Sequence, residues 1–433
     1  MQLKKIDLLL HCRWLIPVIP EGQLLENHCI AIDDGKIISV LPASTASANY
    51  DAKEHIELDR HIVMPGFINT HSYSAIRLLR NQYIDSTDAT LLETKVRTAQ
   101  TQTNNPDFLK DSIGLAAAEM IKTGTTCFAD LFLANHLALD VVRNTDLRSQ
   151  LSFMLSETET SFGQNADEYI HRGLKLYDDV GNHSHIKIAC ATYDFENISD
   201  STMQRMAVFA NELDLPIHFT QHNSLTNNKA NHSLKRLFDF GLLRQETLLA
   251  INQKLHPEEI ALIDKTNSNI ALCEQAINSY NDGNQWVAEL LNSDINLSLG
   301  TENTAGSNLN LFSLLKPLTQ VIVAQDKNFS LTKAAHLALR IATINGAKAL
   351  GWSNEIGSIE TGKFADIIAI EIDSIAYQPL YNPLVQLIHS QDANQVTHSW
   401  VAGKSLLKDR KLQNINEQQL IQSAKDWCIK LAE

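Results

Sequence analysis

A histidine and a tyrosine two residues apart, His71 and Tyr73, close the stretch Met64-Pro65-Gly66-Phe67-Ile68-Asn69-Thr70. On a β-strand the side chains at positions i and i+2 leave the same face, so both rings are expected to project to one side. An imidazole can bind a metal ion. A phenol, with a reference pKa of about 10, is a poor zinc ligand at neutral pH. Of the two side chains, His71 is therefore the better metal donor.

Two further places carry groups that could do chemistry. In the segment Leu215-Pro216-Ile217-His218-Phe219-Thr220, His218 and Thr220 share a strand face, and His222 follows just beyond. The carboxylate of Glu302 follows an apolar strand candidate at residues 295–299. His218 is expected to be a hydrogen-bonded histidine inside the fold, and His222 a loop residue that faces solvent.

The elements that would position these groups change in type along the chain. Residues 6–63 contain short β-prone runs, with Asp33-Asp34-Gly35-Lys36 as a hairpin signal. From residue 64, strand-like runs alternate with helical stretches such as 111–122 and 201–213, which predicts βα units around a parallel barrel. After residue 356 the β pattern returns, and a final helix is expected near 415–432. We therefore predict a discontinuous β domain (1–63 and 356–433) around a βα barrel (64–355).

Bulk composition restricts the class of protein. The chain has 433 residues, 44% of them hydrophobic and 20% charged, with a net charge of -14, which argues against nucleic acid or an anionic membrane as a partner. Six scattered cysteines without close pairs are typical of reduced thiols. The sequence contains no run of about 18 apolar residues, so no membrane span is expected. These features predict a cytoplasmic protein.

Several motifs in order resemble the amidohydrolase superfamily, and more narrowly the bacterial 5-methylthioadenosine/S-adenosylhomocysteine deaminases, which are close to the atrazine and melamine hydrolases. They are the stretch ending at Tyr73, Gly124-Thr125-Thr126-Cys127-Phe128, Leu299-Gly300-Thr301-Glu302, Ala342-Thr343-Ile344-Asn345-Gly346-Ala347 and Gln378-Pro379-Leu380-Tyr381-Asn382-Pro383. The resemblance implies a distorted (β/α)8 barrel, a TIM barrel, with a small β-sandwich formed by both chain ends. It also implies one Zn²⁺ or Fe²⁺ ion that activates a water molecule, and a glutamate and a histidine that transfer protons.

Carried over one position at a time, the resemblance puts unusual residues in the site. The first metal histidine corresponds to His71, the second to Tyr73, and the eighth-strand aspartate to Glu302. The fifth-strand ligand falls at Thr220, and the catalytic glutamate three residues later at Asn223. The remaining family histidines correspond to Tyr193, which precedes the pair Ser199-Asp200, to Ile251 on the sixth strand and to Leu272 on the next.

Our main hypothesis from the sequence is a degenerate family member without metal-dependent deaminase activity and without a metal cofactor, in which His71 and Glu302 are the residual candidate ligands. Its barrel mouth would keep a pocket for a small planar heterocycle or nucleoside. The predicted pocket residues are His71, Tyr73, Tyr193, His218, Thr220, Asn223, Ile251, Leu272 and Glu302.

Two alternatives stay open. In the first, the protein is an active aminohydrolase that binds one zinc or iron ion through a rebuilt set, His71 with His218 or His222 and Glu302. In the second, the chain is a regulatory or structural subunit that pairs with an active paralogue. The resemblance also implies a homodimer, because members of the family are commonly dimers or larger.

Overall fold

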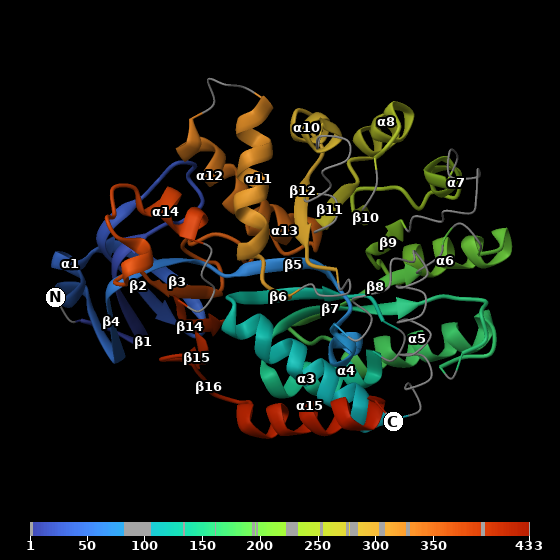
Figure 1. The fold of residues 1–433 in the computed structure, drawn as a ribbon, viewed down its shortest axis with the longest axis horizontal. Helices are drawn as coiled ribbons and strands as arrows, with labels where there is room; N and C mark the ends of the chain where they lie inside the picture. Colours follow the sequence, from blue (N-terminus) through green and yellow to red (C-terminus); the bar gives the residue numbers. More distant parts are fainter. Residues whose placement is uncertain are drawn as a thin grey trace. The chain divides into compact units, whose positions relative to one another are not determined.

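The computed structural model describes residues 3–81, 105–132, 135–160, 162–192, 195, 198–221, 233–251, 254–273, 277, 285–302, 308–325, 330–390 and 395–432. Two eight-stranded sheets organise these residues (Figure 1). The predicted positions Tyr193 and Asn223, together with His222, lie outside the described residues.

Sheet A is built from both ends of the chain, in the order β16-β15-β14-β13-β4-β1-β2-β3. A hairpin joins the strands β2 and β3. Asp34 and Gly35 at its turn both have positive φ, 49° and 74°, as a tight two-residue turn requires. The strands are β1 (Lys4–Leu15), β2 (Leu25–Asp33), β3 (Lys36–Pro42), β4 (Tyr50–Pro65), β13 (Ile367–Glu371), β14 (Val396–Val401), β15 (Lys404–Lys408) and β16 (Lys411–Leu412).

Strands from both chain ends share one apolar core in sheet A. Leu10 and Ile30 from the N-terminal strands pack in the same cluster as Val63, Ile367 and Trp400, and all five side chains are almost fully buried. Each buried side chain of this size contributes about 1.5–3 kcal/mol of hydrophobic free energy. The two ends of the chain are therefore held together by burial as well as by backbone pairing.

Sheet B is a nearly closed parallel barrel in the sequential order β12-β11-β10-β9-β8-β7-β6-β5. Closure between its first and last strands comes from hydrogen bonds. Glu302 N donates to His71 O (3.0 Å), Thr301 N to Asn69 Oδ1 (3.0 Å), and Thr70 Oγ1 to Leu299 O (2.8 Å). The strands are β5 (Phe67–Ser72), β6 (Thr125–Asp130), β7 (Arg148–Met154), β8 (Ile186–Thr192), β9 (Ile217–Gln221), β10 (Thr247–Ile251), β11 (Asn269–Cys273) and β12 (Leu297–Gly300).

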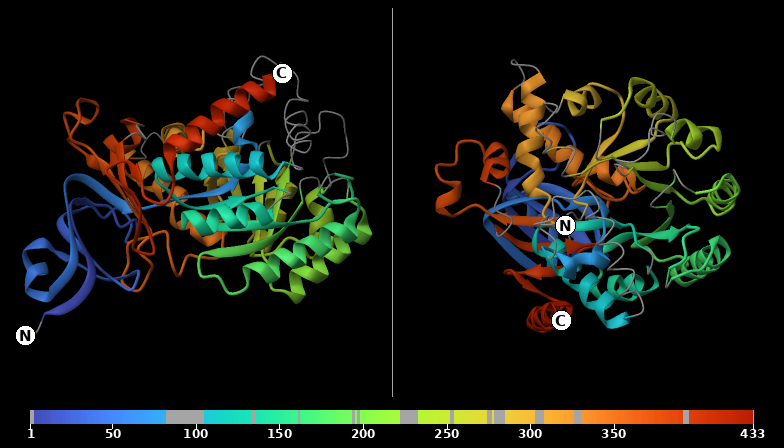
Figure 2. Two further views of the ribbon diagram at one scale, coloured as in Figure 1. Left: turned by 90° about the horizontal axis from the view of Figure 1, so that it is seen from below. Right: turned by 45° about the vertical axis from the view of Figure 1, so that its right-hand side comes forward.

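Helices alternate with the barrel strands, as the sequence pattern predicts. Contacts join α4 to β7, α5 to β7 and β8, and α6 to β8, an arrangement that two further directions of view also show (Figure 2). The connecting helices are η1 (Ser74–Leu79), α3 (Pro106–Lys122), α4 (Asn135–Thr145), α5 (Ala166–Val180), α6 (Asp200–Glu212), α7 (Ser233–Asp239), α8 (Pro257–Thr266) and α10 (Gln285–Leu291).

The remaining helices precede or follow these repeats: α1 (Ala43–Asn49), α11 (Phe312–Gln325), α12 (Leu331–Ala342), α13 (Ile344–Ala349), η3 (Ile375–Tyr377), α14 (Pro383–Ser390) and α15 (Glu417–Ala432). Helix α15 packs through Trp427, whose Nε1 donates to Asp111 (2.8 Å) and whose ring meets Phe108 edge-on.

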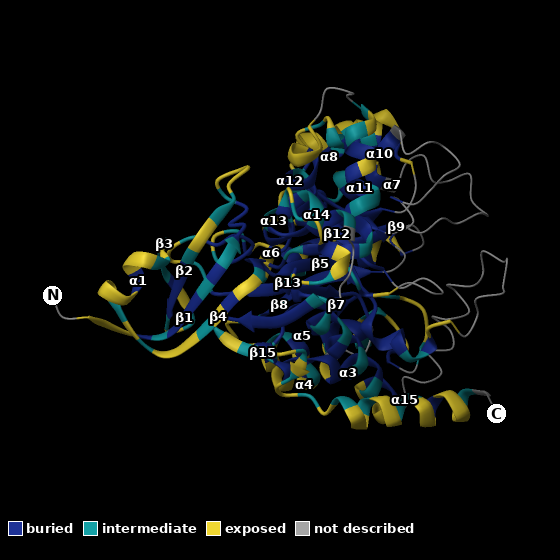
Figure 3. Cartoon of the chain, turned by 60° about the vertical axis from the view of Figure 1, so that its left-hand side comes forward, coloured by how far each residue is buried: buried dark blue, intermediate teal, exposed yellow. Residues whose placement is uncertain are grey.

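In Figure 3 the strands β7 and β8 are almost entirely dark blue, whereas much of α15 is yellow. The barrel strands are covered on both faces, so even the polar side chains of β5 and β7 are buried.

The chain divides into two compact units. Unit 1 comprises Met1–Ile68, Met120–Cys127 and Asn310–Asn414, and unit 2 comprises Asn69–Glu119, Phe128–Leu309 and Ile415–Glu433. The predicted fold class, a (β/α)8 barrel with a β domain from both chain ends, is confirmed. The predicted boundaries at 63/64 and 355/356 stay a prediction. Within the described residues, no helix is both long enough and apolar enough to cross a membrane.

Candidate functional site

The first strand of the barrel delivers His71 and Tyr73. His71 lies on β5 and Tyr73 one residue past its end, and their rings meet edge-on with centroids 5.0 Å apart. Both side chains are buried, at 0% and 2% exposure. Burial raises the pKa of the Tyr73 phenol well above its usual value, and the nearby Glu302 carboxylate raises it further. The phenol is therefore protonated at neutral pH.

The fifth barrel strand, β9, places a second imidazole against the first. Nε2 of His218 lies 3.0 Å from Nδ1 of His71, and the ring centroids are 5.1 Å apart. Burial lowers the pKa of His218 to about 3, so this ring is neutral at pH 7. The contact is thus an N–H···N hydrogen bond in which one ring donates to the other.

Strand pairing decides which residues share the face of His218. Thr220 lies two residues further along β9 and pairs with Ala250 on β10, which in turn pairs with Ala271 on β11. Paired residues of a parallel ladder project to the same side, so these small side chains lie on the face of His218.

The same register bears on the predicted sixth-strand position. Ile251 pairs with Gln221 on β9 and with Leu272 on β11, so Ile251 and Leu272 project to the opposite face from His218 and Thr220. The physical reason is the alternation of a strand: a shift of one residue reverses the face. The assignment of the sixth-strand family position to Ile251 stays a prediction, and the residues that directly follow Ile251 lie outside the described residues.

Glu302 occupies the turn after β12 in a left-handed backbone conformation, with φ of +49°. Its side chain is 1% exposed, and its backbone N–H donates to His71 O. A non-glycine residue in this region is uncommon, and such strain gathers at functional sites. The neighbouring Gly300 is required by space, because a Cβ atom there would lie 2.7 Å from the Cβ of His71. Glu302 is thus held beside the strand that carries His71.

Two buried groups that the sequence reasoning missed lie beside these residues. Cys273, at the end of β11, pairs with Gly300 on β12, and burial together with the Glu302 carboxylate raises its thiol pKa. Asp130, at the end of β6, accepts hydrogen bonds from the backbone N (2.8 Å) and the hydroxyl (2.7 Å) of Ser74. Burial raises the Asp130 pKa to about 6, against the effect of these bonds. Asp130 thereby fixes the turn directly after Tyr73.

The described residues can be tested for a metal site. Among them, no group of three or more histidine, cysteine, aspartate or glutamate side chains is arranged to hold a metal ion. A ring nitrogen of His71 and one of His218 point at each other, and Glu302 is a buried acidic residue whose backbone N–H donates to His71 O. The described part of the site therefore does not by itself fit a catalytic metal.

Comparison with known proteins gives one family throughout. The Amidohydrolase family profile matches residues 62–406. A 5-methylthioadenosine/S-adenosylhomocysteine deaminase of Teredinibacter turnerae is 33% identical over 98% of both chains. One of Saccharophagus degradans is 32% identical over 98% of this chain and 97% of its own.

Solved structures agree with the sequence relatives. An adenosine deaminase from Xanthomonas campestris with bound zinc superimposes over 100% of both chains with a TM-score of 0.92 and 26% identity. The atrazine chlorohydrolase TrzN from Arthrobacter aurescens, complexed with zinc, superimposes over 97% of this chain and 99% of its own with a TM-score of 0.83. At 20% identity, the second similarity shows the fold alone.

The expectation of a protein without a metal cofactor is wrong by this comparison. The adenosine deaminase that superimposes over the whole chain has bound zinc, which implies a metal for a family member of this kind. Substitution of family ligand positions does not by itself exclude a metal ion, because side chains at other positions can supply ligands.

Proposed function

Because the chain belongs to the amidohydrolase family, we propose that it is an aminohydrolase that acts on a C–N bond of an adenosine-type nucleoside. The observation that carries the proposal is the near full-length match to a deaminase of such substrates at 33% identity. The adenosine deaminase structure, which covers the whole chain at a TM-score of 0.92, supports the same substrate class.

The buried cluster suits a planar, hydrogen-bonding ligand. Tyr73 and His71 present aromatic rings, and His218 adds a neutral imidazole that accepts or donates a hydrogen bond. Glu302 adds a carboxylate acceptor from the turn after β12. Aromatic rings stack on or meet edge-on a heterocycle, while the polar atoms fix its orientation. Tyr73 and Glu302 follow the carboxyl ends of β5 and β12, the end of a barrel at which barrel enzymes bind substrate.

His71 and Glu302 are the described residues that we assign to a metal ion, since they occupy the motif positions that carry ligands in the resemblance. A bound metal ion would supply an activated water molecule. A rearranged His218, or segments outside the described residues, which include His222, would supply further ligands.

The test is turnover of nucleosides by the purified full chain. Adenosine, 5-methylthioadenosine and S-adenosylhomocysteine are each incubated with and without added Zn²⁺, and ammonia release is measured. We expect zinc-stimulated release that His71→Ala abolishes and Cys428→Ser, at an exposed cysteine, leaves unchanged. Absence of ammonia release at every metal concentration, with a folded protein, would rule the proposal out.

A second candidate is a family member that binds the nucleoside without turning it over. The observation that favours it is the N-to-N contact of His71 and His218 beside a threonine, Thr220, where a conventional ligand would stand. Calorimetry separates the two candidates: heat of nucleoside binding without ammonia release supports the second. The homodimer implied by the resemblance stays a prediction, which sedimentation velocity tests.

A further inference from the structure

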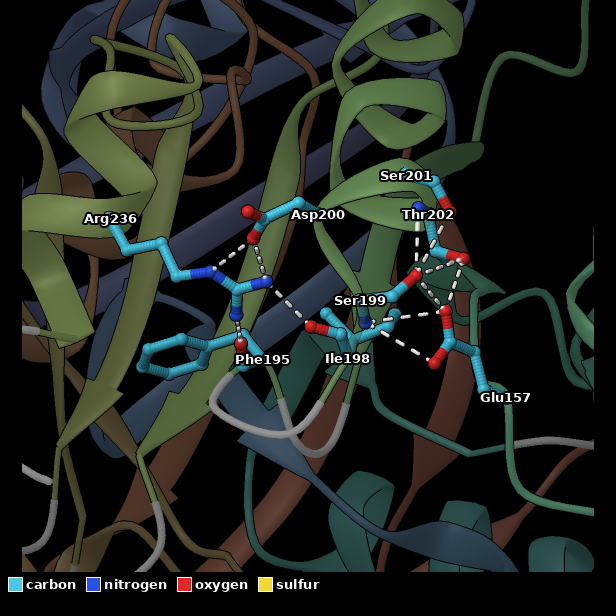
Figure 4. Close-up of polar contacts among 8 residues, drawn as sticks. All are labelled: Glu157, Phe195, Ile198, Ser199, Asp200, Ser201, Thr202 and Arg236. Carbon is cyan, nitrogen blue, oxygen red and sulfur yellow. Dashed lines mark hydrogen bonds and ion pairs between the residues drawn. The ribbon is translucent and has the colours of Figure 1, made fainter.

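The connection between β8 and α6 leaves the carboxyl end of its strand, where the loops of a barrel build the binding site. The side chain of Arg236, on α7, donates hydrogen bonds to backbone carbonyl groups of this connection. Nη1 donates to Phe195 O (2.9 Å) and Nη2 to Ile198 O (2.6 Å), as Figure 4 shows. The same guanidinium pairs with Asp200 at the start of α6, with Nη2 2.6 Å from Oδ1. One side chain thus ties two carbonyls and a carboxylate of a neighbouring connection.

Glu157, which follows β7, holds the same connection at another point. Its carboxylate accepts hydrogen bonds from the backbone N and the hydroxyl of Ser199 and from the hydroxyl of Thr202 (Figure 4). These bonds lower the Glu157 pKa, so the carboxylate is charged at neutral pH. Ser199 also caps α6 by accepting from Thr202 N. The α6 end of the connection is therefore fixed from two other segments of the chain.

The described part of the connection reaches the candidate site through an aromatic contact. The ring of Phe195, 1% exposed, lies against Phe219 of β9 with centroids 5.4 Å apart. Phe219 stands between His218 and Thr220, with its ring on the opposite face of the strand. Because both rings are buried in a close-packed interior, a displacement of Phe195 moves Phe219 and the strand that carries it.

We propose that Arg236 is a positioning residue for the candidate site, which holds Phe195 against Phe219 and thereby sets the position of His218 and Thr220. The consequence for ligand affinity rests on the proposed function, because the ligand is an adenosine-type nucleoside. The consequence for the His218 ring does not depend on any ligand. Lysine cannot replace Arg236, since an ammonium group lacks the planar fork that reaches two carbonyls and a carboxylate together.

The experiment compares full-length variants on the same helix. Arg236→Met removes the guanidinium, and Arg236→Lys keeps a charge for Asp200 without the fork. The matched control is Lys235→Met, which removes the adjacent cation and its pair with Asp239. Phe195→Leu weakens the contact with Phe219 and leaves Arg236 in place. It therefore tests whether this contact sets the position of His218, even if Arg236→Met does not fold. Histidine ring NMR signals are recorded for each, with the His218 signal identified by its loss in His218→Gln, and adenosine affinity is measured by calorimetry.

We expect Arg236→Met and Phe195→Leu to shift the His218 ring signal and to weaken adenosine binding about tenfold, Arg236→Lys to show a smaller change, and Lys235→Met to show neither. An unmoved His218 signal in folded Arg236→Met and Phe195→Leu would overturn the inference. If the unmodified chain binds no adenosine, the proposed function fails, and the ring signal alone decides on Arg236. If it binds adenosine equally well in all variants, only the role of Arg236 fails.

Discussion

The ring nitrogens Nδ1 of His71 and Nε2 of His218 lie 3.0 Å apart in the barrel, within hydrogen-bond distance of each other. Since burial keeps His218 neutral, the two rings share one proton between a donor and an acceptor nitrogen. A metal ion at His71 through this nitrogen would compete with that hydrogen bond. Metal affinity in this chain is therefore limited by the bond between two histidines as well as by the number of ligands.

A second histidine on the first strand should raise metal affinity. Tyr73 leaves the same strand region as His71, two residues on, so Tyr73→His adds an imidazole beside the first. Even outer partners of a metal site are worth about 10- to 100-fold in affinity, so an added ligand should increase zinc affinity by about 100-fold or more. Competition with a chromophoric chelator measures it. Tyr73→Phe is the control, and equal affinity in both variants would show that Tyr73 does not face the metal.

A carboxylate at position 223 should raise turnover. By the resemblance, Asn223 replaces the glutamate that transfers protons, and an amide cannot take up a proton. General acid–base catalysis contributes roughly 10²- to 10⁴-fold, so Asn223→Glu in the Tyr73→His background should increase ammonia release within that range. Asn223→Gln in the same background, which matches the length without the charge, should give no increase. Equal rates for the two would place the proton-transfer group elsewhere.

The fold could be predicted because its signals are local. Asp34-Gly35 has the backbone that its hairpin signal demands, and Ser199 caps the helix expected from residue 201. Within the β pattern that returns after residue 356, the strands β14 and β15 form a hairpin with Ala402 and Gly403 at its turn. The sequence does not predict this turn, because Ala402 adopts a positive φ that is uncommon for alanine.

The site was less predictable, for a reason visible on β10. The run Leu248-Leu249-Ala250-Ile251 is buried on both faces, so it lacks the alternation that would show which residue points into the barrel. Pairing with β9 supplies that information. Cys273 and Asp130 reach the site through tertiary placement alone, since neither belongs to a motif in the sequence.

Space beside His71 should not tolerate a methyl group. A Cβ atom at Gly300 would lie 2.7 Å from His71 Cβ and 3.1 Å from His71 O. Overpacking of this kind costs about 1–3 kcal/mol, so Gly300→Ala should lower the free energy of unfolding by that amount and displace His71. Urea unfolding and metal affinity measure the two effects. Gly241→Ala is the comparison, because a Cβ there meets nothing within 4 Å and only its φ of +70° is strained. Unchanged metal affinity in Gly300→Ala would mean that His71 tolerates the shift.

Stability below neutral pH should depend on His61 of sheet A. Burial, and then the neighbouring His398, lower the His61 pKa from 6.5 to about 4. The unfolded chain therefore binds a proton at this histidine between pH 6.5 and pH 4 that the folded chain does not bind. Folding stability from this group is fully present above pH 6.5 and is lost as the pH falls through that window.

From pH 7 to pH 4.5 the loss should be about 2 kcal/mol, because one pKa unit corresponds to about 1.4 kcal/mol. We expect urea unfolding to show this fall in the unmodified chain and a fall smaller by that amount in His61→Leu. The exposed His55→Leu, in the same sheet, serves as the control and should keep the full fall. Equal pH dependence in the unmodified chain and His61→Leu would mean that His61 takes up its proton in the folded protein as readily as in the unfolded one.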